Sequence, residues 1–236
     1  MAETKEETVH EPATDADVGS RGVTIVCGLL QRDCVVLVSD RRVVYGSGAV
    51  YDHHRKLFGS GACGVGFAGS TDVAEACVGQ VPLPRSADWP SVARFVGDLR
   101  AVFFDLVAED ERAQRGFDGL VAGSGPDGSV HLWSLRSDAA TPQPCTIGLA
   151  CVGVAGPFAL AIGGQLHRPD LGADAVLGLG TFLVEAASRC YAGVGGGIDW
   201  LAFGAGADRL GDSQTGSRWR VESTARLGPL FARWPG

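Results

Sequence analysis

Three side chains near the start of the chain could together perform nucleophilic chemistry. Thr24 opens an apolar, β-branched run, Asp40 closes the next such run 16 residues later, and Lys56 follows after another 16 residues. A threonine hydroxyl is a weak nucleophile until a base or a nearby positive charge activates it, and the α-amine of Thr24 could be that base if Thr24 began a mature chain. The spacing therefore predicts an active site. A strand threonine beside a structural ion pair is the alternative.

The residues around this trio predict pairs of short strands. Runs rich in Val, Ile and Leu are separated by brief polar or glycine-containing connections such as Gln31-Arg32-Asp33, a pattern typical of hairpins. We expect strand pairs at 23–30 with 34–40, at 43–45 with 49–51, and at 56–58 with 64–69.

Helical periodicity appears after the third pair. Ser70-Thr71-Asp72 offers N-cap chemistry for a helix over 73–78, and apolar stripes predict helices over 90–110 and 172–191. Further strands are expected at 119–123, 129–135, 146–154, 158–162, 198–203 and 219–223. This order predicts an α+β fold, in which two antiparallel sheets cover each other and helices cover their outer faces. A doubly wound parallel sheet would need alternating strands and helices.

Composition narrows the class of protein. The 236 residues suit one domain over 23–236, and the net charge of −7 argues against nucleic acid as a partner. The seven cysteines form no CxxC pair, which indicates reduced thiols in a cytoplasmic protein, with Cys190 buried on its helix stripe. No run is long and apolar enough to span a membrane. Residues 1–22 lack the apolar segment of a signal peptide and are expected to be disordered.

Two other patterns have residue types that occur in binding sites. His53-His54 has no third ligand in a metal-binding spacing, so a solvated loop is expected there. The glycine-rich stretch 193–197 lacks the Lys-Ser/Thr of a phosphate-binding loop and follows a helix, so a turn is expected. No metal ion and no organic cofactor are predicted.

Four short motifs together resemble the proteasome β-subunit family and the related HslV-type peptidases, which are N-terminal-nucleophile hydrolases. They are Thr24-Ile25-Val26, Val38-Ser39-Asp40-Arg41-Arg42, Lys56-Leu57 and Gly66-Phe67-Ala68-Gly69. The resemblance is tight over about 23–80 and looser to about residue 205. It implies a four-layer αββα sandwich, an amide or peptide substrate, and a homo-oligomer, which in this family is often a ring.

The resemblance also implies roles for single residues. Thr24 matches the nucleophile, Lys56 the lysine that lowers the pKa of the reacting group, and Asp40 the carboxylate that orients this lysine. Gly69 resembles the glycine whose N–H stabilises the oxyanion. Phe67 falls where the family lines its specificity pocket. Arg42 and Gly46 match structural positions, and Val44 stands where active members often carry a threonine that contacts the substrate.

Two departures from the family pattern leave a second function open. The segment 161–165 lacks the serine of a Gly-Ser-Gly motif, and 188–193 lacks an aspartate that supports the amine. A catalytically silent structural or binding subunit is therefore the alternative to a hydrolase. Residues 1–22 are expected to be a disordered leader, a propeptide, or a stretch assigned to the protein by a wrong start codon. An active chain must begin at Thr24, either by self-cleavage after Val23 or by initiation of translation at position 23.

Overall fold

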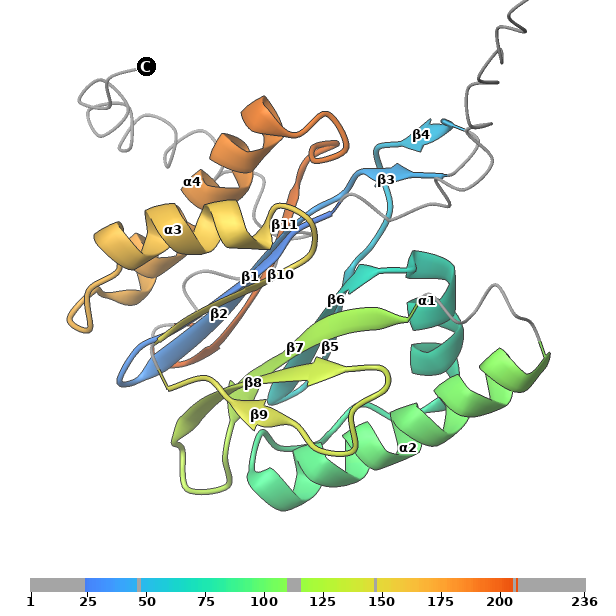
Figure 1. Ribbon diagram of the computed structural model, residues 1–236. Helices are drawn as coiled ribbons and strands as arrows, with labels where there is room; N and C mark the ends of the chain where they lie inside the picture. Colours follow the sequence, from blue (N-terminus) through green and yellow to red (C-terminus); the bar gives the residue numbers. More distant parts are fainter. Residues whose placement is uncertain (1–23, 46–47, 110–115, 147, 206, 208–236) are drawn as a thin grey trace, which may run out of the picture.

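The computed structural model describes residues 24–45, 48–109, 116–146, 148–205 and 207. These residues form four helices, two large antiparallel sheets and a two-stranded ribbon (Figure 1). The strands are β1 (Val26–Leu30), β2 (Cys34–Asp40), β3 (Val43–Val44), β4 (Val50–Tyr51), β5 (Leu57–Ser60), β6 (Cys63–Gly69), β7 (Phe117–Ser124), β8 (Val130–Arg136), β9 (Gln143–Pro144), β10 (Leu149–Val152) and β11 (Ile198–Gly204). The helices are α1 (Thr71–Gln80), α2 (Trp89–Glu109), α3 (Gly156–Leu166) and α4 (Ala173–Cys190).

The two sheets contain different parts of the chain. One has the strand order β10-β1-β2-β11, and the other has the order β5-β6-β7-β8-β9. Every pairing is antiparallel, including the long-range pairs of β1 with β10 and of β2 with β11. The hairpins expected at 23–40, 43–51, 56–69 and 119–135 are therefore confirmed, and the described residues form a mixed α/β fold with antiparallel sheets.

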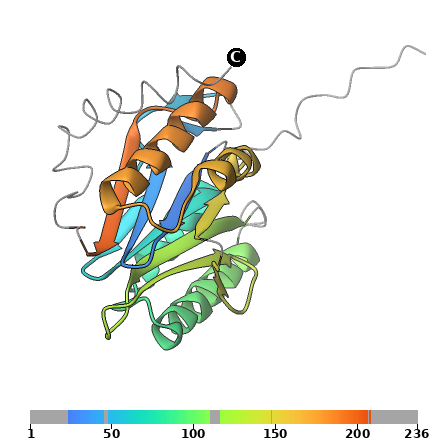
Figure 2. The same cartoon turned by 90° about the vertical axis from the view of Figure 1, so that its left-hand side faces the viewer.

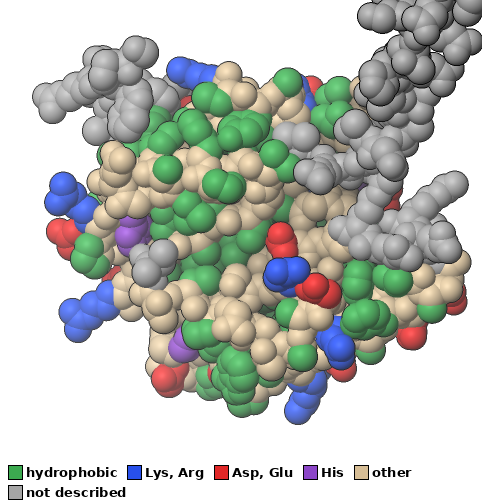
Figure 3. Space-filling model, viewed as in Figure 1, with side chains coloured by type: hydrophobic (Ala, Val, Ile, Leu, Met, Phe, Trp, Pro, Cys, Tyr) green, Lys and Arg blue, Asp and Glu red, His purple; other side chains and the backbone are tan. Residues whose placement is uncertain are grey.

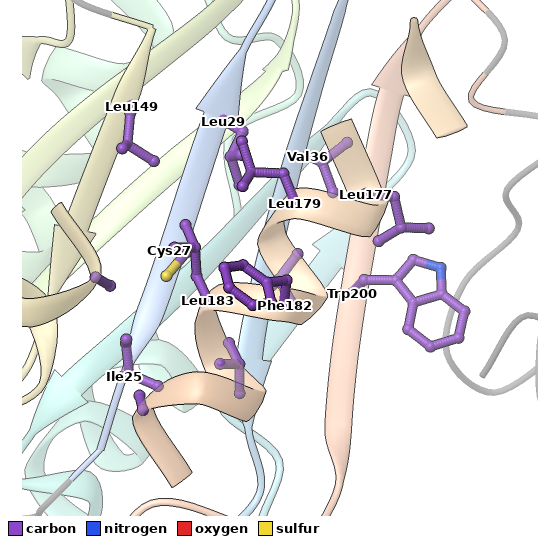
Figure 4. Packing of buried hydrophobic residues seen from close by; sticks show 14 of the residues in the cluster. Ile25, Cys27, Leu29, Val36, Leu149, Leu177, Leu179, Phe182, Leu183 and Trp200 are labelled. Atoms are coloured by element: carbon purple, nitrogen blue, oxygen red, sulfur yellow. The ribbon is translucent and has the colours of Figure 1, made fainter. Parts of the chain in front are cut away.

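Three apolar clusters hold these elements together. The first lies between the β10-β1-β2-β11 sheet and helices α3 and α4, and its members include Leu29, Phe182 and Leu183 (Figure 4). The second lies between the other sheet and helices α1 and α2, and the third lies between the two sheets. In Figure 2, α4 lies at the top and α2 at the bottom, with strands of both sheets between them. The helices expected at 73–78, 90–110 and 172–191 are present as α1, α2 and α4, and each covers one face of a sheet.

One predicted strand is wrong. The run 158–162 belongs to helix α3, which begins at Gly156 with Pro157 in its first turn. A short, continuous apolar run fits a buried strand and a buried helix equally well, and a proline at the start of a helix favours the helix. The strand before it is also shorter than expected, because β10 covers only Leu149–Val152.

Smaller differences concern chain ends. Cys190 was expected to be buried, but it is exposed, because it is the last residue of α4 and lies beyond the part of the helix that packs on the sheet. The predicted strand at 219–223 and the predicted leader at 1–22 lie outside the described residues, as does Gly46.

Candidate active site

The ends of three strands bring Thr24, Asp40 and Lys56 together. Pairing of β1 with β2 places Val26 opposite Ser39, so that Thr24 lies beside the end of β2 at Asp40. The Thr24 hydroxyl donates a hydrogen bond to Asp40 Oδ1 at 3.0 Å, and Lys56 Nζ donates to the same oxygen at 2.6 Å. All three residues are buried. The structure therefore brings together the three residues that the spacing singled out.

Asp40 is the centre of this arrangement because five groups donate hydrogen bonds to its carboxylate. Oδ1 accepts the Thr24 hydroxyl, the Lys56 ammonium and the Ile25 N–H. Oδ2 accepts the N–H groups of Arg42 and Gly195 at 3.2 Å and 3.1 Å. So many donors fix the orientation of the carboxylate.

Lys56 is a buried ammonium with two acceptors. Besides Asp40 it donates to the carbonyl oxygen of Arg42 at 2.5 Å. Burial lowers the pKa of Lys56 below its ordinary value of 10.5, although the Asp40 carboxylate acts in the opposite direction. An ammonium has three N–H donors, and no third acceptor for this one occurs among the described residues.

Two glycines missed by the sequence analysis shape the surroundings of this trio. Gly153 has a φ of +96°, and a Cβ on it would lie 2.2 Å from the carbonyl oxygen of Thr24 and 3.1 Å from Ala68 Cβ. Gly195 has a φ of +151°, and its N–H reaches Asp40 while its carbonyl accepts the N–H groups of Arg41 and Arg42. The turn expected at 193–197 is therefore part of the site. Contacts between residues so distant in sequence leave no local signal.

Gly69 lies at the same end of the molecule as Thr24. Its neighbour Ala68 faces Gly153, which in turn packs on Thr24. The Phe67 N–H donates to the carbonyl of Lys56, on the β5 side, and the Ser70 N–H donates to the carbonyl of Gly116, on the β7 side. N–H groups alternate in direction along an antiparallel strand, so the Gly69 N–H, two residues after that of Phe67, points toward the β5 side. Because β5 begins only at Leu57, no strand residue in the described part of the chain lies opposite this N–H.

The structure does not bring Phe67 to Thr24. Phe67 packs in the core under helices α1 and α2, with its ring 5.1 Å from that of Phe117. Side chains alternate along a strand, so Ala68, on the opposite face of β6, is the residue beside Gly153 and Thr24. Val44 lies in the ribbon opposite Val50 and is partly exposed.

Arg42, whose backbone N–H binds Asp40, forms a clamp with its side chain: the guanidinium holds Asp52 and the carbonyl of Ala192 together. The Arg42 guanidinium binds both carboxylate oxygens of Asp52, at 2.6 Å and 3.2 Å, and donates to the carbonyl of Ala192 at 2.9 Å. It thereby joins the ribbon to the loop that carries Gly195. Arg42 in turn lowers the pKa of Asp52 through their hydrogen bonds. The motif resemblance assigned Arg42 a structural position but did not indicate which residue it binds.

The junction between a strand and the third helix lies at a different place from the one expected from the sequence. The segment 161–165 lies inside α3, so the junction between a strand and the third helix is Gly153-Val154-Ala155 instead. This junction carries no hydroxyl side chain. The segment after α4, Tyr191 to Gly197, carries no carboxylate.

Two cavities open next to this end of the sheets. One, of about 730 Å³, lies between the edge strand β10 and strands β7 to β9, and Val152 is among the residues that line it. The other, of about 470 Å³, is lined by Ala68, Gly69 and the apolar side of α2. Asp118 and Arg136 border both. Figure 3 shows the surface in the orientation of Figure 1, with apolar side chains gathered over helix α3.

The described residues offer neither a cluster of metal ligands nor a membrane-spanning helix. Within the described ranges, no group of three or more His, Cys, Asp or Glu side chains could hold a metal ion. His54 pairs with Glu75 at 3.0 Å. None of the helices in the described part of the chain is long and apolar enough to cross a membrane.

The comparison with solved structures shows that the chain has a proteasome-like fold. Among solved structures, the chain is similar to Anbu (ancestral beta-subunit) from Yersinia bercovieri, with a TM-score of 0.69. The match covers 90% of this chain and 98% of that chain at 15% sequence identity.

Membership of the proteasome β-subunit and HslV-like family, which the four motifs predicted, is not upheld. No family model matches the chain, and no curated protein matches its sequence. The similarity found is one of fold at 15% identity. The four motifs all lie between Thr24 and Gly69, around one site, whereas membership of a family needs sequence similarity along most of the chain.

Proposed function

We propose that this protein is a proteasome-like N-terminal-nucleophile hydrolase that cleaves amide or peptide bonds with Thr24. The observation that carries the proposal is that Thr24 Oγ1 and Lys56 Nζ both bind Asp40 Oδ1, in a buried position at the strand ends. In support, we assign the facing sheets and their covering helices to the four-layer αββα sandwich of such hydrolases.

The chemistry follows from a chain that begins at Thr24. The freed α-amine accepts the hydroxyl proton while Oγ1 attacks the substrate carbonyl carbon. Lys56, held by Asp40, stabilises the negative charge that develops near Oγ1. The Gly69 N–H, which has no ladder partner, donates to the oxyanion. The Thr24 ammonium then protonates the departing amine, and a water molecule, deprotonated by the same amine, hydrolyses the resulting ester.

The intact chain is a precursor in this proposal. In it the nitrogen of Thr24 is part of a peptide bond, and the Thr24 side chain is 2% exposed. Removal of residues 1–23, or their absence from the natural protein, supplies the free amine that the mechanism needs. The processed domain associates with copies of itself, a proposal supported by the description of the structural neighbour as a β-subunit.

A catalytically silent subunit is the second candidate. It is favoured by the junction Gly153-Val154-Ala155, which offers the nucleophile's amine no hydroxyl partner. Loss of an orienting group can lower a rate by orders of magnitude even when the reacting groups remain.

Covalent labelling separates these candidates. A chain that begins at Thr24 is incubated with a β-lactone, which acylates a hydroxyl, and with an epoxyketone, whose adduct also needs the free amine. The hydrolase predicts both adducts on Thr24, lost in Thr24→Ala but kept in Thr71→Ala, a matched change at the start of α1. The intact chain should resist the epoxyketone. Absence of both adducts on folded, processed protein would favour the silent subunit.

A further inference from the structure

Two cysteines lie directly opposite each other beside the candidate site. The register of β1 and β10 pairs Cys27 with Cys151, and their Sγ atoms are 3.3 Å apart. This distance is shorter than an ordinary contact between two sulfur atoms and fits a thiol hydrogen bond. These two residues are 124 positions apart in the sequence, so only the fold brings them together.

The type of strand pairing decides whether these thiols can be joined. Leu30 N–H donates to the Gly148 carbonyl at 2.7 Å, which makes Leu30 and Gly148 a hydrogen-bonded pair. Hydrogen-bonded and non-hydrogen-bonded pairs alternate along an antiparallel ladder, so Cys27 and Cys151, three pairs further on, form a non-hydrogen-bonded pair. Such pairs have Cα atoms about 4.5 Å apart, within the range of about 4.4–6.8 Å that a disulfide spans.

The two thiols differ in accessibility. Cys27 is fully buried under α3 and α4, and its hydrogen bond to Cys151, together with burial, raises the pKa of Cys27 well above the usual thiol value. Cys151 is partly exposed on the edge strand β10 and borders the cavity of about 730 Å³. A small oxidant in this cavity therefore meets Cys151 first. Cys145 borders the same cavity and is the competing partner for Cys151.

We propose that Cys27 and Cys151 are an oxidation site that forms a cross-strand disulfide in the presence of a hydroperoxide. The Cys151 sulfur attacks the peroxide oxygen, which gives a sulfenic acid and releases water. The Cys27 sulfur then attacks the Cys151 sulfur, loses its proton and displaces hydroxide, which leaves as a second water. In total, two thiols and one hydrogen peroxide give one disulfide and two waters.

The bond would join the two strands that position Thr24. Cys27 lies three residues after Thr24 on β1, and Cys151 lies two residues before Gly153, which packs on the Thr24 carbonyl. The oxidised protein should therefore hold these strand ends more firmly. The bond also closes a long loop, which stabilises the folded state by restricting the unfolded chain. This site does not depend on the proposed function.

Peptide mapping of the full chain tests the proposal directly. After treatment with hydrogen peroxide in slight excess and digestion without reduction, we expect one cross-linked peptide pair containing Cys27 and Cys151. The intact protein should be lighter by about 2 Da, the mass of the two hydrogens lost. Sulfenic or sulfinic adducts without a cross-link, or a cross-link between Cys151 and Cys145, would overturn the assignment. The wild-type protein alone decides this, so no variant has to fold.

Variants then test the partner choice. Cys27→Ser and Cys151→Ser should each lower the yield of the cross-linked peptide by at least about tenfold, whereas Cys190→Ser and Cys145→Ser should leave it unchanged. In Cys27→Ser, Cys151 should instead accumulate as a sulfenic or sulfinic acid. The melting temperature of the oxidised wild type should exceed that of the dithiothreitol-treated protein by several degrees, roughly 5 °C. An unchanged melting temperature in protein shown to be cross-linked would refute the predicted effect on the strand ends.

Discussion

Replacement of Asp40 by asparagine is the sharpest test of the buried site. The change keeps the shape of the side chain but removes the negative charge that faces the Lys56 ammonium at 2.6 Å. Lys56 and Asp40 side chains are 1% and 0% exposed, so water cannot replace the lost charge. Removal of one partner from a buried ion pair usually costs about 3–5 kcal/mol, because the other charge stays buried alone. We expect Asp40→Asn to lower the free energy of unfolding by about 4 kcal/mol.

Chemical denaturation at pH 7, followed by tryptophan fluorescence, measures this change. Asp138→Asn is the matched control, because Asp138 also pairs with a basic residue, Arg136, but both side chains are more than half exposed. This control should show no measurable loss. The double variant Asp40→Asn with Lys56→Met should be more stable than Asp40→Asn alone, since it removes the stranded ammonium. The reasoning is refuted if Asp40→Asn loses less than about 1 kcal/mol or if the second substitution restores nothing.

The pH dependence gives an independent check on Lys56. Because burial lowers the pKa of Lys56 below 10.5, the unfolded chain binds more protons than the folded chain in the window just below that pH. Stability contributed by this group should therefore rise with pH in that window. In Asp40→Asn the carboxylate no longer raises the pKa of Lys56, so the rise of stability with pH should begin at a lower pH. In Lys56→Met this rise of stability with pH should be absent.

Three further predictions follow from single positions. Gly153→Ala should cost more than about 2 kcal/mol, because its Cβ would meet the Thr24 carbonyl at a positive φ, whereas Gly164→Ala, on the open side of α3, should be neutral or stabilising in the same denaturation assay. Arg42→Lys should destabilise by about 1–2 kcal/mol, because an ammonium cannot replace the bidentate contact, and an equally stable variant would argue against the clamp. In native protein at pH 8, iodoacetamide should modify exposed Cys190 long before Cys63, whose pKa burial raises to about 12; mass spectrometry that found Cys63 modified first would contradict this.

Local patterns predicted most of the fold. Alternating β-branched runs with short polar connections gave the hairpins of β1 with β2 and β5 with β6, since both the strands and their turns are encoded within a few residues. Helices α2 and α4 were equally clear, because an apolar stripe repeated over many turns fits no other structure. The strand predicted at 158–162 was wrong because five consecutive apolar residues show neither helical nor strand periodicity, and only Pro157 favoured a helix.

The candidate site was predictable in part. Thr24, Asp40 and Lys56 stood out because hairpins fix how residues 16 apart meet. Gly153 and Gly195 did not, because their roles depend on contacts with Thr24 and Asp40 across more than a hundred residues. Phe67 was assigned to a substrate pocket from its position in a motif, although the alternation of β6 turns its side chain into the core.

The five donors around Asp40 also set an order of events during synthesis. Four come from residues no later than Lys56, but the fifth, the Gly195 N–H, is separated from Asp40 by 155 residues. At ordinary rates of translation the ribosome adds that last donor about 10–30 s after Asp40 has been made. The loop that carries it lies between α4 and β11, and β11 pairs with β2. The complete set of five donors around Asp40 therefore needs almost the whole domain to have been synthesised.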